Sequence, residues 1–114
     1  MVKRETLAKS VLKRNIELLT ITTNDKDQEP KNLNEQEHKA RRVVVVLGRV
    51  HPGESPSSFV CQGLLDFLVS AHPIAKVLRD YLVFKIIPML NPDGVYYGNY
   101  RYQLFFQKLF KQLL

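Results

Sequence analysis

The sequence predicts an α/β fold, in which a parallel or mixed sheet is flanked by helices. This prediction comes from two continuous apolar runs, RVVVVLGRV at 42–50 and YLVFKIIP at 81–88, and from the helical segment between them. Runs without polar alternation are typical of strands that are buried on both faces. A strand, a helical connection and a second strand form a βαβ unit with parallel strands. The 114 residues are expected to form one domain, or part of one.

The segments before this unit are predicted from spacing and composition. Residues 4–15 place three apolar side chains at helical spacing, which predicts a short amphipathic helix. Residues 16–23, IELLTITT, are rich in β-branched side chains and contain no Gly or Pro, which predicts a strand. Residues 24–40 are polar and charged without a periodic apolar set, so we expect a mobile surface loop there.

Helices are predicted between and after the two apolar runs. Residues 55–70 repeat apolar side chains near a period of 3.6, with Ser55 as a candidate cap and Pro56 in the first turn. A second short helix is expected over 73–79. Leu and Phe again recur at helical spacing over 103–114, which predicts a helix that packs against other elements.

Composition excludes several classes of function. The formal net charge is +6, from 17 Lys and Arg against 11 Asp and Glu, but the basic residues are dispersed, so no nucleic-acid partner is expected. Attraction to an acidic partner stays open. No apolar run approaches the roughly 20 residues of a membrane span, and the N-terminus has no apolar signal region. With Cys61 as the single cysteine, a reducing, intracellular compartment fits best.

Two polar, turn-rich loops follow the two predicted strands. His51-Pro52-Gly53-Glu54 follows the first, and Asn91-Pro92-Asp93-Gly94, which continues to Arg101, follows the second. Ligands of parallel α/β sheets bind beyond the carboxyl ends of the strands. We therefore expect the two loops to meet at one edge of the sheet and to form the candidate site.

The first loop contains a His-x-x-Glu pattern. On a tight turn, these two side chains can direct an imidazole nitrogen and a carboxylate oxygen at one Zn²⁺ ion. A catalytic zinc typically takes three protein ligands, and His51 with Glu54 supplies two. A turn with a surface histidine and a glutamate at a helix start explains the pattern equally well, so both interpretations remain open.

The remaining candidates have simpler explanations. Turn formation alone accounts for residues 91–94. Arg101 could hold a carboxylate or stabilise an oxyanion near a zinc ion, although composition alone indicates a surface arginine. His72 is expected to open the second helix, and His38 falls in the predicted loop. Cys61 is expected to be a buried thiol rather than a nucleophile.

Two segments, GRVHPGESPSSFVCQGLLDFLVS and FKIIPMLNPDGVYYGNYR, together resemble the cytosolic carboxypeptidases of the zinc-dependent M14 metallocarboxypeptidase family, in particular its deglutamylases. The resemblance extends from about Lys3 to Arg101. It implies that residues 1–101 are the N-terminal part of a carboxypeptidase catalytic domain, with the sheet correspondingly incomplete. Residues 102–114 are unlike the family and form a divergent tail.

The resemblance also implies roles for individual residues. His51 and Glu54 would be zinc ligands, and Arg101 would bind substrate, polarise the scissile carbonyl and stabilise the oxyanion. Residues 91–94 would be a structural turn. The implied reaction is zinc-dependent hydrolysis that removes C-terminal glutamates. The implied substrates are polyglutamylated tubulin or other acidic tails, in the cytoplasm and in association with the cytoskeleton or cilium.

After Arg101 the sequence departs from the family. The Asp-Leu-Asn-Arg motif that holds the substrate carboxylate, the later histidine ligand and the glutamate general base have no counterpart in this chain, and neither has the preceding β-rich domain. We therefore expect the chain alone to be inactive, because two ligands hold zinc less securely than three and no general base is present. The alternatives are a truncated isoform that binds acidic tails or a partner through Arg101 and the basic surface, and a translation product that does not accumulate as a folded protein.

Overall fold

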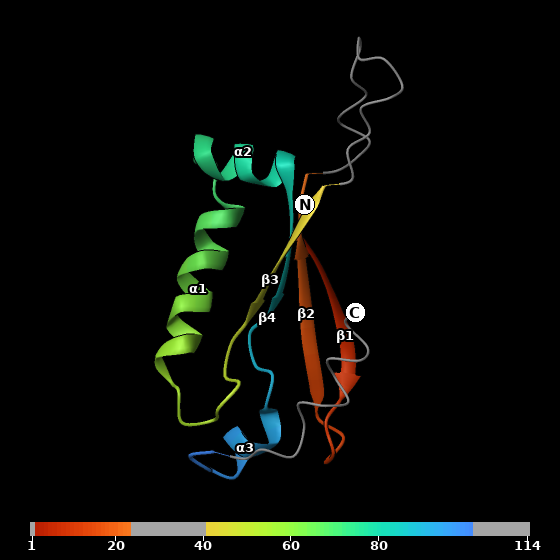
Figure 1. Ribbon diagram of the computed structural model, residues 1–114, viewed down its shortest axis with the longest axis vertical. Helices are drawn as coiled ribbons and strands as arrows, with labels where there is room; N and C mark the ends of the chain where they lie inside the picture. The colour runs from red at the N-terminus through yellow and green to blue at the C-terminus, as the bar shows by residue number, and fades with distance from the viewer. Residues whose placement is uncertain (1, 24–40, 102–114) are drawn as a thin grey trace.

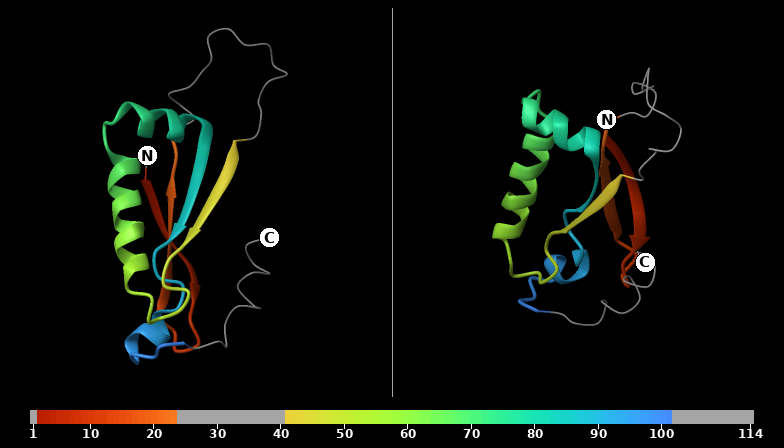
Figure 2. Two further views of the ribbon diagram at one scale, coloured as in Figure 1. Left: turned by 60° about the vertical axis from the view of Figure 1, so that its left-hand side comes forward. Right: turned by 45° about the horizontal axis from the view of Figure 1, so that its top comes forward.

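The computed structural model describes residues 2–23 and 41–101, which form one four-stranded sheet with helices (Figure 1). The strands are β1 (Val2–Lys9), β2 (Asn15–Ile21), β3 (Arg42–Leu47) and β4 (Leu82–Ile87). The helices are α1 (Pro56–Val69), α2 (Pro73–Tyr81) and α3 (Pro92–Tyr96). Helices α1 and α2 lie on one face of the sheet, whereas α3 lies beyond one end of it (Figures 1 and 2).

The sheet is mixed, with the strand order β1-β2-β4-β3. Strands β3 and β4 are parallel neighbours, paired from Arg42 with Leu82 through Leu47 with Ile87. Strand β2 runs antiparallel to both β4 and β1. The prediction of a βαβ unit within an α/β fold is therefore confirmed.

The prediction of a helix over residues 4–15 is wrong. Strand β1 pairs with β2 along its whole length, and a turn in which Lys13 has φ +63° joins the two strands. Leu7 packs against the core, whereas Val11 and Leu12 lie in the turn and are exposed. A register shift between Thr6 and Ala8 interrupts the alternation by which a strand is recognised. Pairing with β2 thus overrides an apparent helical spacing.

The core consists of two apolar clusters, which lie on opposite faces of the sheet because side chains alternate along each strand. The helix-side cluster contains Ile21, Leu68, Phe84 and Ile86. The cluster on the other face contains Ile16, Leu18, Ile87 and Leu90. Each packs further partly buried apolar side chains against it, so both faces contribute to stability.

The expectation that the first apolar run is buried on both faces is only half right. Val44 and Val46 of β3 pack into the helix-side cluster. Val43 and Val45, which alternate with them, are 56% and 51% exposed. Within the part of the chain that the structure describes, α1 and α2 cover only the face of β3 that carries Val44 and Val46 (Figure 2).

Both predicted helices between β3 and β4 are confirmed, with Pro56 and Pro73 in their first turns. His72 opens α2 as expected, because its Nδ1 accepts a hydrogen bond of 3.2 Å from the backbone N–H of Ile74. Ser55 is not the expected side-chain cap of α1, since its own backbone is already helical. Ser57 instead donates a hydrogen bond to the carbonyl of Glu54.

Two sequence predictions, the loop over 24–40 with His38 and the helix over 103–114, lie outside the described residues. Among the residues described, no single helix is long and apolar enough to cross a membrane. Helices α1 and α2 are long and apolar enough for a membrane span only when they are counted together, and the pair is bent by 93°.

Candidate metal centre

The loop after β3 and the turn after β4 meet at one edge of the sheet, as the sequence predicts (Figure 1). Gly48 donates a hydrogen bond of 2.8 Å to the carbonyl of Ile87 and accepts one of 2.9 Å from the N–H of Leu90. A Cβ atom at position 48 would lie 2.5 Å from the carbonyl oxygen of Pro88. Only glycine therefore allows the two segments to approach so closely.

His51 and Glu54 point toward each other across the first loop. Nδ1 of His51 lies 2.8 Å from Oε1 of Glu54, and the N–H of Glu54 donates to the carbonyl of His51 over 3.1 Å. Both side chains remain partly exposed. The hydrogen bond from His51 holds the pKa of Glu54 below its usual value, the charge of Arg101 acts in the same direction, and partial burial opposes both.

An imidazole nitrogen and a carboxylate oxygen that converge in this way are a suitable donor set for Zn²⁺. Within residues 2–23 and 41–101, however, no group of three His, Cys, Asp or Glu side chains could hold a metal ion. Among the residues that the structure describes, the site therefore offers two candidate zinc ligands and no third.

Arg101 is held near this pair through its neighbour Tyr100. The backbone N–H of Gly53, between the two candidate ligands, donates to the carbonyl of Tyr100 over 3.2 Å. A Cβ atom at position 53 would lie 2.7 Å from the Tyr100 ring. The charge of Arg101 also contributes, as the smallest of the causes, to lowering the pKa of Glu54. Its role toward a substrate stays a prediction.

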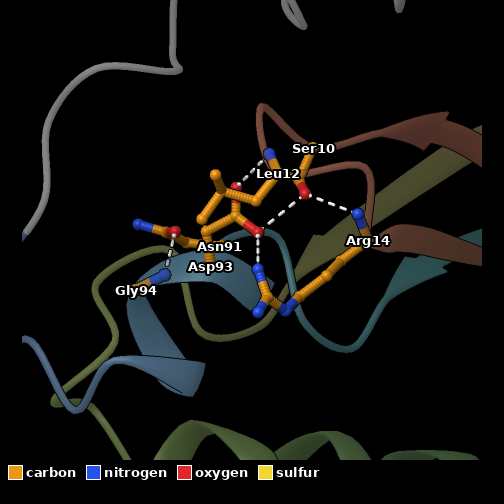
Figure 3. Close-up of polar contacts among 6 residues, drawn as sticks. All are labelled: Ser10, Leu12, Arg14, Asn91, Asp93 and Gly94. Carbon is orange, nitrogen blue, oxygen red and sulfur yellow. Dashed lines mark hydrogen bonds and ion pairs between the residues drawn. The ribbon is translucent and has the colours of Figure 1, made fainter.

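Asp93, in the second loop, serves the fold rather than the candidate site. Its carboxylate accepts hydrogen bonds from Ser10 Oγ at 2.7 Å, from the N–H of Leu12 at 3.1 Å and from Arg14 Nη1 at 2.9 Å (Figure 3). Burial alone would raise the pKa of Asp93, but these three donors outweigh it and lower the pKa. The Arg14 guanidinium also lies 3.9 Å from the centre of the Tyr96 ring. Asp93 thus fastens α3 to the β1–β2 turn.

The two loops are in direct contact. Gly94 donates to the Oδ1 of Asn91 over 3.0 Å, which fixes the start of α3 (Figure 3). A Cβ atom on Gly94 would lie 2.3 Å from Cγ of Pro52, the residue after His51. The anchored second loop therefore supports the first.

Sequence reasoning missed three of the residues that build this edge: Ser10, Arg14 and Arg49. Ser10 and Arg14 are separated from Asp93 by 83 and 79 positions, so no local pattern links them. Arg49 precedes His51 by two residues and contacts Pro52 and Ser58. Cys61 is buried, as predicted, and burial raises the pKa of its thiol.

Comparison with known proteins shows the family to which the chain belongs. The model of the zinc carboxypeptidase family, Peptidase_M14, matches residues 1–108. The chain is 62% identical over 101 residues to cytosolic carboxypeptidase 6 of Mus musculus, an alignment that covers 89% of this chain and 17% of the mouse protein. It is 50% identical over 102 residues to cytosolic carboxypeptidase 2 of Homo sapiens, covering 90% of this chain and 10% of that protein. The chain thus spans less than a fifth of the length of these curated relatives.

Solved structures show the same fold. A metallo-carboxypeptidase from Burkholderia cenocepacia is similar with a TM-score of 0.72 and 30% identity, over 88% of this chain and 24% of that one. A metallo-carboxypeptidase from Pseudomonas aeruginosa is similar with a TM-score of 0.65 and 27% identity, over 86% of this chain and 24% of that one. The mixed sheet and its helices are therefore a portion of a larger known architecture.

Proposed function

Because the chain belongs to the M14 zinc carboxypeptidase family, we propose that it provides two zinc ligands and the substrate-binding arginine of a carboxypeptidase that removes C-terminal glutamates from acidic protein tails. The observation that carries this proposal is the convergence of His51 Nδ1 and Glu54 Oε1 at 2.8 Å beyond the carboxyl end of β3. Membership of the family supports the class of reaction, and the geometry supports the choice of side chains.

His51 and Glu54 would hold the zinc ion. A carboxylate can only accept a hydrogen bond, so Nδ1 of His51 is the donor in this contact, and it would have to be free of its proton to act as a metal ligand. The lowered pKa of Glu54 favours the ionised carboxylate that a metal ligand requires. When bound, zinc polarises a carbonyl and acidifies a water molecule.

Arg101 would orient the substrate. A guanidinium next to the zinc ligands can bind a carboxylate through two parallel (bidentate) hydrogen bonds, or it can stabilise negative charge on a carbonyl oxygen. The net charge of +6 favours acidic tails, and polyglutamylated tubulin is the substrate that we propose. The relatives named cytosolic carboxypeptidases support a cytoplasmic location, and association with the cytoskeleton or cilium is part of the same proposal.

We expect the 114 residues alone to bind such tails without cleaving them. Within the described ranges no third ligand accompanies His51 and Glu54. A catalytic zinc site typically needs three protein ligands, and a positioned general base contributes about 10²- to 10⁴-fold to the rate. Binding without hydrolysis is therefore the outcome that the local geometry supports.

Peptide binding tests the proposal. Binding of a peptide that ends in four glutamates is measured by fluorescence anisotropy with and without Zn²⁺, and glutamate release is followed by mass spectrometry. We expect Zn²⁺ to tighten binding of the free-acid peptide but not of its C-terminal amide. Arg101→Ala should weaken binding, whereas Arg42→Ala, which removes the same charge from β3, should not.

Two outcomes would contradict the proposal. Equal binding by wild type and Arg101→Ala would remove the arginine from the site, and glutamate release by the wild-type chain would overturn its inactivity. The alternative function, a module that binds acidic tails without any part in hydrolysis, predicts instead that peptide binding is independent of both Zn²⁺ and His51.

A further inference from the structure

Arg49 spans the turn that carries the two candidate ligands. Its Nε and Nη2 donate hydrogen bonds of 3.0 and 2.7 Å to the carbonyl of Pro52, which lies between His51 and Glu54. Its Nη1 donates to Ser58 Oγ over 3.2 Å. A single guanidinium therefore connects the middle of the turn with the first turn of α1.

The backbone of Arg49 also has an unusual conformation that contacts with α1 stabilise. Its φ is +49°, and Lys13 is the only other described residue besides glycine with a positive φ. L-amino acids other than glycine enter this region at an energetic cost, which surrounding contacts must offset. One such contact is the hydrogen bond of 2.9 Å from the N–H of Arg49 to Ser57 Oγ. That hydroxyl in turn donates to the carbonyl of Glu54 over 2.7 Å.

These contacts enclose the turn from both ends. The guanidinium fixes the carbonyl that follows His51, and the Arg49–Ser57 pair fixes the carbonyl of Glu54. The side chains of His51 and Glu54 contact each other and are partly exposed. Arg49 thus acts on the backbone of the turn and leaves the ligand atoms accessible.

We propose that Arg49 is a positioning residue for the metal pair, which holds the His51–Glu54 turn in the conformation in which Nδ1 and Oε1 converge. This inference rests on the proposed zinc function. The contact with Pro52 uses two nitrogens of a planar guanidinium, and a lysine ammonium offers no such fork. Lysine at position 49 therefore keeps the charge but loses the geometry.

Arg79 provides a matched control at the opposite end of α1. Its Nη1 donates to the carbonyls of Leu68 and Ser70, so it also ties backbone carbonyls together through a guanidinium. These carbonyls lie where α1 ends, at the opposite end from His51 and Glu54. Arg79→Lys should affect stability without changing metal affinity.

The test compares the Zn²⁺ affinity of wild type, Arg49→Lys and Arg79→Lys by titration of the full chain, followed through the His51 ring resonances, with thermal unfolding measured in parallel. Loss of side chains that orient metal ligands typically weakens affinity about 10- to 100-fold, so Arg49→Lys should bind Zn²⁺ at least about tenfold more weakly. Arg79→Lys should stay within about twofold of wild type even where its melting temperature falls. Should Arg49→Lys not fold, Ser58→Ala, which removes only the acceptor of Nη1, should also weaken Zn²⁺ binding, and unchanged affinity of that variant would overturn the positioning role.

Zn²⁺ affinity of Arg49→Lys within about twofold of wild type would overturn the positioning role while leaving the zinc function intact. An equal loss in both lysine variants would overturn it as well, because that pattern reports general destabilisation. Absence of Zn²⁺ binding at His51 in the wild-type chain would instead overturn the proposed function, and the positioning role would fall with it.

Discussion

The two turns at the carboxyl edge of the sheet use their acidic side chains in different ways. Glu54, in the turn after β3, contacts a histidine three residues away, and both side chains are open to solvent. Asp93, in the turn after β4, accepts hydrogen bonds from three groups of the β1–β2 turn, about 80 residues earlier in the chain, and its side chain is 13% exposed.

The difference in hydrogen bonding indicates that Asp93 contributes to stability, whereas Glu54 is available to bind a ligand. A carboxylate whose oxygens are already occupied by donors from elsewhere in the fold stabilises the chain but is not available to a ligand. A carboxylate paired with one exposed imidazole contributes little to stability and can exchange that partner for a cation. The Asp93 turn therefore supports the candidate site, which the His51–Glu54 turn carries.

The largest expected effect on stability comes from Asp93→Ala. Removal of the carboxylate leaves Ser10 and Arg14 without their acceptor, and we expect the free energy of unfolding to fall by about 3 kcal/mol. Asp93→Asn, which keeps one acceptor oxygen, should lose less. Urea unfolding of the three proteins measures both effects, and an unchanged midpoint for Asp93→Ala would contradict the structural role of this turn.

A somewhat smaller loss is expected from Gly94→Ala. The added methyl group would lie 2.3 Å from Cγ of Pro52, so α3 and the His51–Glu54 turn must separate. Overpacking of this kind costs about 1–3 kcal/mol, and it should also weaken Zn²⁺ binding because the turn loses its support. Unfolding and Zn²⁺ titration of the same variant would measure both. Full stability with full affinity would show that the two turns are not coupled.

Acid should destabilise the chain through Asp93. Its pKa is lowered in the folded state, so below the ordinary aspartate value of about 3.9 the unfolded chain binds more protons than the folded one. The stabilisation by this carboxylate is thus complete near neutral pH and disappears as the pH falls through its folded pKa. The free energy of unfolding should therefore drop less steeply between pH 5 and pH 2 in Asp93→Asn than in wild type. Parallel curves for the two proteins would exclude this origin.

The smallest effect, of opposite sign, is expected from Gly63→Ala. Gly63 lies within α1, and a Cβ atom there would meet no other atom within 4 Å. Alanine in a helix interior is favoured over glycine by about 1 kcal/mol, so this variant should be slightly more stable than wild type. Thermal unfolding would measure the gain, and a loss would indicate that this face of α1 has a partner.

The parts of the fold that could be predicted from sequence are those with local signals. Continuous apolar runs identified β3 and β4, the 3.6-residue period identified α1, and the position beyond the strand ends brought His51, Glu54 and Arg101 into one region. The prediction that is wrong, a helix over residues 4–15, concerns a segment whose conformation depends on contacts distant in the sequence. Strand β1 acquires its conformation from pairing with β2.

The residues that anchor the candidate site could not be predicted from the sequence either. The partners of Asp93 lie at the other end of the described chain, so the Asn-Pro-Asp-Gly pattern predicts a turn at the candidate site but not the contacts that anchor it. The role of Arg49 depends on a positive φ, which is uncommon for arginine and has no signature in the sequence. Sequence thus predicted the candidate ligands but not the residues that hold them in place.

Zn²⁺ titration of the full chain by NMR tests the central assignment most directly. Wild type should bind one Zn²⁺ with shifts centred on His51 and Glu54, and His51→Ala and Glu54→Gln should each abolish this binding while the amide spectrum of the sheet is preserved. The double variant His38→Asn and His72→Asn, which removes the other two histidines but leaves asparagine able to cap α2, should bind as wild type does. Zn²⁺ binding that survives in His51→Ala and disappears in the double variant would contradict the assignment.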